Sequence, residues 1–91
     1  MKLTDRFSTP KDVMARVVGD ETVILDLRSG VYFGLDPVGT EIWKLLSAGS
    51  SLADVCTALL DRYEVTAVQL ESDVLKLASE LQSRGLILPA P

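Results

Sequence analysis

The 91-residue sequence contains no histidine and only one cysteine, Cys56. Because histidine is the commonest general base and a frequent metal ligand, its absence excludes the usual catalytic triads. A lone cysteine excludes an internal disulfide and a cysteine metal site. Cys56 falls on the apolar stripe of a predicted helix, which favours an inert thiol. We therefore expect no enzyme activity, no metal and no cofactor.

The sequence also lacks excess positive charge and long apolar runs. Thirteen acidic residues against nine basic ones give a net charge of −4, which argues against a nucleic-acid partner. No apolar run approaches the roughly 20 residues that cross a bilayer. The first residues, 1–6, lack the apolar segment of a signal peptide. We expect a cytoplasmic protein that does not bind a membrane.

A hydrophobic fraction of 47% indicates one packed domain, which we place at residues 13–91 after an N-terminal arm at residues 1–12. Leu25 and Leu27 alternate with polar neighbours, which is the period of a strand. Ser29-Gly30 then predicts a tight turn. Short turns between the predicted strands require antiparallel pairing. The three strands are expected at residues 13–18, 22–27 and 31–35.

Helical periodicity follows the third strand. Asp36-Pro37 is typical of a helix start, and a helix is expected over 37–48. A second helix is expected from Ser51 to about residue 64, and a third over 66–84. The fold class is therefore α+β, a winged helix-turn-helix-like domain with a three-stranded antiparallel sheet followed by three helices. Because no long strand follows residues 31–35, we expect that strand to keep one open edge.

The stretch from Gly30 to Trp43 has the pattern Gly-x-Tyr-x-x-Leu-Asp-x-x-Gly-x-x-Ile-Trp. This pattern, together with Asp73-Val74 and the later Gly85-Leu86, resembles the PqqD-like family of peptide-recognition domains, also called RiPP recognition elements. Tyr-Phe-Gly after the turn is most similar to the stand-alone lasso-peptide leader-binding proteins. The resemblance implies a non-catalytic domain that binds the leader of a precursor peptide as an added strand. It also implies a separate cysteine leader peptidase as a partner, and possibly the cyclase.

The residues themselves support strand addition. An edge strand exposes unpaired N–H and C=O groups that an extended peptide can complete, while pockets for alternate side chains supply specificity. We expect the strand and a groove against the third helix to bind the peptide, and a proline at Phe33 to abolish binding if that amide points outward. Without leader, the edge could stay free in a monomer or pair in a dimer. The candidate residues are Val31, Tyr32, Phe33, Gly34, Leu35, Leu70, Asp73, Val74 and Leu77.

Two other functions stay open at this stage. A winged-helix DNA-binding regulator would use the same fold, although Glu71, Asp73 and Glu80 make the third helix poorly suited to base edges. A small acid–base enzyme could use Asp26 or Asp36, but no recognisable pair of carboxylates supports it. Asp73 could also be a solvated helix residue.

Overall fold

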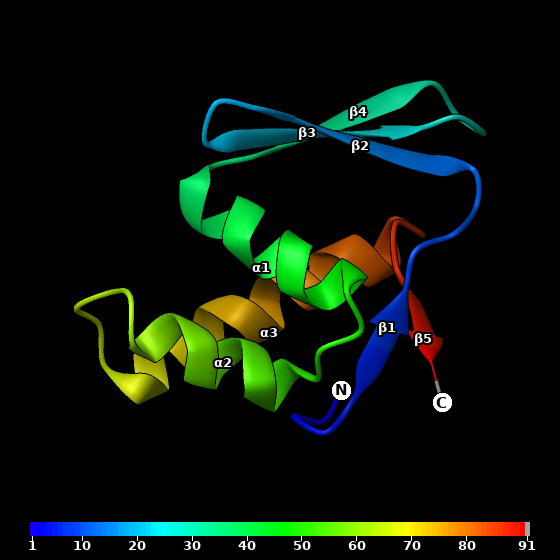
Figure 1. Ribbon diagram of the computed structural model, residues 1–91. Helices are drawn as coiled ribbons and strands as arrows, with labels where there is room; N and C mark the ends of the chain where they lie inside the picture. Colours follow the sequence, from blue (N-terminus) through cyan, green and yellow to red (C-terminus); the bar gives the residue numbers. More distant parts are fainter. Residues whose placement is uncertain (91) are drawn as a thin grey trace.

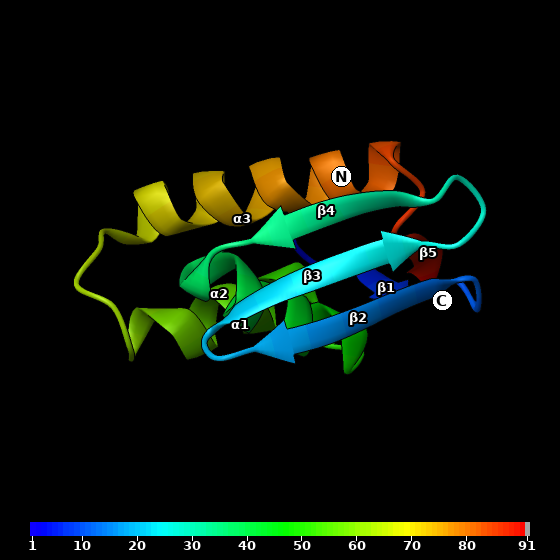
Figure 2. The same ribbon diagram turned by 90° about the horizontal axis from the view of Figure 1, so that it is seen from above.

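The predicted sheet is present in the computed structural model, which describes residues 1–90. Strands β2 (Val13–Val18), β3 (Glu21–Asp26) and β4 (Val31–Leu35) pair antiparallel in the order β2-β3-β4. Figure 2 shows β3 in the middle with β2 and β4 on either side. Within residues 1–90, no other strand pairs with the outer edge of β4.

Three helices follow the sheet, as expected from the sequence. They are α1 (Pro37–Ser47), α2 (Leu52–Leu60) and α3 (Ala67–Ser83). Each begins after a capping residue whose side chain accepts a hydrogen bond from the backbone N–H three residues further on. The second helix ends earlier than predicted, because the Arg62 and Tyr63 amides both turn back to the carbonyl of Leu59. The caps are Asp36, Ser51 and Thr66.

All three helices lie on one side of the sheet (Figure 1). Alternation along the strands explains which residues face them: Ile24 is fully buried, whereas Val23 and Tyr32 on the opposite face are 37% and 67% exposed. Trp43 of α1 is buried in the core. The core consists of Phe7, Val13, Ile24, Leu35, Ile42, Trp43, Leu46, Leu52, Val55, Leu59, Leu70, Val74, Ala78, Leu81, Leu86 and Ile87.

The two ends of the chain form a second small sheet that the sequence did not reveal. β1 (Arg6–Ser8) pairs antiparallel with β5 (Leu88–Ala90), and Phe7 of β1 is buried in the core. The segment expected as an arm is therefore packed against the domain. Strands of three residues are too short to display an alternating pattern, and Pro89 obscures the second one further. Because β5 pairs with β1, the C-terminal segment does not cover β4.

No helix in residues 1–90 is both long and apolar enough to cross a bilayer.

Candidate functional site

The open edge of β4 is the first component of the candidate site. In an antiparallel pair, the N–H and C=O of one residue point to the same neighbouring strand, and the direction reverses at the next residue. The Asp26 carbonyl accepts a hydrogen bond from the Gly30 N–H at 2.8 Å, on the β4 side. The Leu27 N–H donates to the Asp12 carbonyl at 2.9 Å, on the β2 side. Asp26 and every second residue before it in β3 therefore direct their polar groups to β4.

The register then determines which amides of β4 face outward. Asp26 lies opposite Val31, so Phe33, two residues further on, directs its N–H group to β3. The Val31 N–H donates to the Ser29 Oγ in the turn at 3.3 Å. Tyr32 and Gly34 direct theirs away from the sheet, to the unpaired edge. The Phe33 amide thus points inward, to β3. A proline at Phe33 would break a bond within the sheet, so it does not test leader binding.

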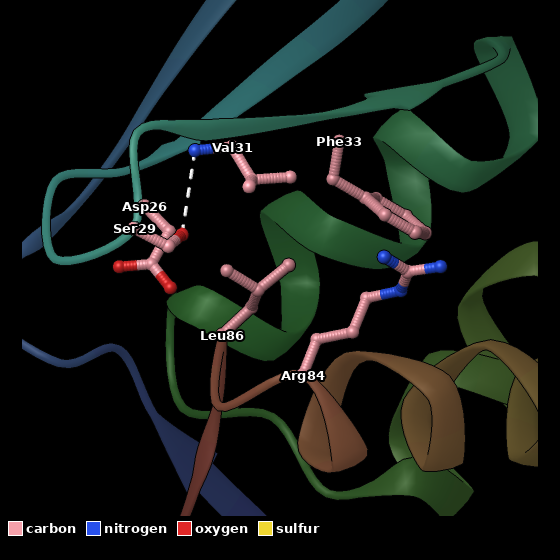
Figure 3. A pocket seen from close by; sticks show the side chains of 6 residues that line it. All are labelled: Asp26, Ser29, Val31, Phe33, Arg84 and Leu86. Atoms are coloured by element: carbon pink, nitrogen blue, oxygen red, sulfur yellow. Dashed lines mark hydrogen bonds between the residues drawn. The ribbon is translucent and has the colours of Figure 1, made fainter.

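A groove lies between this edge and the end of α3. It has a volume of about 270 Å³ and is open to solvent. In Figure 3, Val31 and Phe33 point from β4 toward Arg84 and Leu86, which follow α3. Asp26 at the end of β3 and Ser29 in the following turn also line the groove. The lining therefore combines apolar side chains with a carboxylate on the strand side and a cation on the helix side.

Arg84 provides that cation. Its guanidinium carbon lies 4.8 Å from the centre of the Phe33 ring, within the range of a cation–π contact. One Nη atom also lies 3.4 Å from a carboxylate oxygen of Glu80, one helical turn earlier. Arg84 is the C-cap of α3, where the negative end of the helix dipole favours a positive charge. The side chain is half-exposed, so donors remain available to a bound peptide.

Of the residues predicted on the strand, Val31 and Phe33 line the groove. Tyr32 lies on the opposite face of the sheet and is exposed, so Phe33 is the aromatic residue that packs toward the core. Gly34 is exposed at the edge, with no heavy atom within 4 Å of the position that a Cβ would take. Leu35 is buried in the core and anchors the end of β4.

The residues predicted on α3 lie elsewhere. Leu70 and Val74 are buried in the core, and Leu77 is half-buried against it, so none of the three lines the groove. Asp73 is exposed and accepts a hydrogen bond from the Gln69 side chain at 2.9 Å. A helical seam of apolar residues faces the core first. The groove therefore meets the helix side at the end of α3, and peptide contact at the four predicted positions stays a prediction.

Sequence reasoning missed four groove residues: Asp26, Ser29, Arg84 and Leu86. In the sequence, Leu86 is notable only through the Gly85-Leu86 part of the family pattern, and nothing marks Arg84 as a groove residue. The proximity of Phe33 to Arg84 depends on how α3 packs beneath the sheet, and no local pattern encodes that packing.

The single cysteine, Cys56, lies outside the groove. Burial raises the pKa of the Cys56 thiol, and the negative charge of Glu71 raises it further, which favours the unreactive thiol form. Among residues 1–90, no three acidic or cysteine side chains are grouped closely enough to hold a metal ion.

A vacant strand edge beside an apolar groove is the geometry of a domain that binds an extended peptide. A family model described as coenzyme PQQ synthesis protein D (PqqD) matches residues 21–87. The chain belongs to the PqqD family. No match was found among curated proteins.

Two solved structures resemble this PqqD-family domain over most of its length. One is TbiB1 in complex with the TbiA(beta) leader peptide: it is 32% identical, the match covers 88% of this chain and 93% of that one, and the TM-score is 0.83. The other is a lasso peptide synthetase B1 complexed with the leader peptide. It is also 32% identical, with 92% and 99% of the two chains covered and a TM-score of 0.84. Both similar proteins are thus B1 proteins in complex with leader peptides.

Proposed function

We propose that this domain binds the leader segment of a ribosomally made precursor peptide, of the lasso type, by adding it as a strand to β4. The observation that carries the proposal is the unpaired edge of β4, which lies directly beside the groove lined by Val31, Phe33 and Arg84. The leader complexes of the two similar structures support the same function.

The proposed binding mode divides affinity and specificity between two parts of the site. The outward N–H and C=O groups of Tyr32 and Gly34 form ladder hydrogen bonds with the leader backbone, whatever its sequence. Alternate leader side chains point toward the helical side of the sheet and enter the groove. Because Phe33 and Leu86 are apolar and Arg84 lies over the Phe33 ring, the groove favours an apolar or aromatic leader side chain.

The domain itself is non-catalytic in this proposal. It acts in the cytoplasm and delivers the bound leader to a separate cysteine peptidase, and possibly to the cyclase. Holding the leader on a rigid scaffold raises its effective concentration at the partner enzyme. We expect a monomer when leader is bound. A dimer paired through β4 would occupy the same edge and would therefore dissociate when leader is added.

The direct test is a fluorescence-polarisation titration with a labelled leader segment of the precursor encoded beside this gene. The core segment of the same precursor is the negative control, and the TbiA(beta) leader tests cross-recognition. Saturable binding of the leader alone is expected. Equal binding of leader and core, or no binding of the cognate leader, would contradict the proposal.

Delivery is tested separately, by following leader removal by the peptidase with and without the domain. We expect faster cleavage with the domain present. An unchanged rate, with leader binding intact, would refute delivery and leave recognition standing.

A further inference from the structure

Arg28, in the turn between β3 and β4, contacts two parts of the chain that are far apart in sequence. Its Nε donates to Asp26 Oδ1 at 2.9 Å, and one Nη donates to the backbone carbonyl of Gly85 at 2.8 Å. Asp26 lines the groove, and Gly85 lies between the two groove residues Arg84 and Leu86. One guanidinium group therefore joins the strand side of the groove to its helix side.

No other hydrogen bond makes this connection. Among residues 1–90, the bond from Arg28 to Gly85 is the only one that joins the sheet segment 13–35 to α3 or the residues after it. A second contact across the groove is Arg84 over the Phe33 ring, and Phe33 also packs against the core cluster that contains Leu86. A cation–π contact constrains orientation less strictly than two hydrogen bonds from a planar guanidinium. The directional link between β4 and the end of α3 thus depends on Arg28.

The Gly85 side of the contact has little room to change. Gly85 has φ +72°, a conformation that L side chains rarely adopt, and a Cβ there would come within 3.3 Å of the Arg28 Nη. On the other side, Asp26 holds the guanidinium with two side-chain contacts and also accepts a hydrogen bond from the Arg28 amide at 3.0 Å. The Asp26 side therefore fixes Arg28, whereas Gly85 has its positive φ because it ends α3, where its N–H donates to the Gln82 carbonyl and the Leu86 N–H donates to the Leu81 carbonyl.

We propose that Arg28 is a positioning residue for leader recognition: it bridges Asp26 and Gly85 and so holds the groove open at the width that an added strand and its side chain require. This inference rests on the proposed leader-binding function. Its physical basis is preorganisation, because a groove that is already set loses less conformational freedom on binding. Arg28 itself need not touch the leader.

The test compares four variants by leader titration: Arg28→Met, Arg28→Lys, Asp26→Asn and the double variant Arg28→Met/Asp26→Asn. Methionine retains the length of the side chain but donates no hydrogen bond, and we expect affinity to fall about tenfold, or about 1.4 kcal/mol. Lysine retains the charge and can bond to only one partner well, so it should restore part of the loss. Because both residues act through one bridge, the double variant should bind no more weakly than Arg28→Met.

Two controls separate positioning from charge and from general stability. Arg16→Met makes the same change on the exposed strand β2, outside the groove, and should bind as the parent does. Val55→Ala lowers stability from a fully buried site in α2 and should leave affinity unchanged at a temperature where the protein stays folded. Melting curves identify that temperature for every variant.

Leader binding by the parent protein separates a failure of the positioning role of Arg28 from a failure of the proposed function. If the parent binds leader and Arg28→Met binds within about twofold of it, Arg28 does not position the groove. A loss in Arg28→Met that Val55→Ala reproduces at equal stability would also refute positioning. If the parent binds no leader, the proposed function itself is wrong.

Discussion

Replacing Gly34 with proline tests strand addition at a single N–H group. The register directs the Gly34 N–H away from β3, to the edge that we propose the leader occupies. Proline removes this donor without removing any bond between β3 and β4. Proline is tolerated on edge strands when the lost N–H faces outward. The residue before a proline must have an extended backbone, and Phe33 already has one as part of β4. The fold should therefore survive while leader binding fails.

The expected loss follows from the hydrogen bonds involved. Removing the donor leaves a leader carbonyl without its partner, which costs about 2 kcal/mol. About 2 kcal/mol corresponds to roughly 30-fold weaker binding. The ring of proline also occupies space at the edge, which can only increase this loss.

Gly34→Ala is the matched control because it keeps the N–H, and no heavy atom lies within 4 Å of the added Cβ. Polarisation titrations of both variants against the same labelled leader, with melting curves alongside, complete the assay. We expect Gly34→Ala to bind as the parent does. A folded Gly34→Pro protein with parental affinity would refute strand addition at β4. Should Gly34→Pro not fold, Tyr32→Pro removes the other outward donor and tests the same point.

The remaining predictions concern the groove, the core and two titratable groups. Arg84→Met should weaken leader binding about twofold to fivefold, because a cation–π contact at an exposed site contributes roughly 0.5–1 kcal/mol. Unchanged affinity would remove Arg84 from the site. Leu81→Ala should lower the free energy of unfolding by about 3 kcal/mol in urea melts, since Leu81 is fully buried, and a loss below about 1 kcal/mol would contradict that packing. Cys56 should react with a thiol reagent more slowly in the folded protein than in denaturant at the same pH, because burial raises its pKa; equal rates would argue against this. Leader affinity should change little between about pH 8 and pH 5, because the sequence has no histidine and the hydrogen bond from Arg28 lowers the pKa of Asp26 below its usual 3.8. Arg28 stabilises the carboxylate form of Asp26, so the contact between the two side chains is complete above pH 3.8 and is lost only as the pH falls through the lowered pKa. A change of leader affinity near neutral pH would refute the role of this contact.

The elements of the fold could be predicted because their signals are local. Asp36, Ser51 and Thr66 each cap a helix as their positions indicated. The strand at residues 31–35 was predicted with its observed bounds, since alternation and turn chemistry act within a few residues. The pairing of β1 with β5 could not be predicted, because three-residue strands carry no periodic signal and their partners are about 80 residues apart.

At the site, local signals in the sequence were enough to locate the edge strand with its aromatic and glycine residues and to reveal the family resemblance. The packing of the folded chain was needed to show that Phe33 rather than Tyr32 faces the groove and that Gly34 rather than Phe33 offers an outward amide. The physical reason is that a groove belongs to two elements at once. Its lining depends on the packing of α3 against the sheet, and Arg28 and Arg84 acquire their contacts only when that packing is complete.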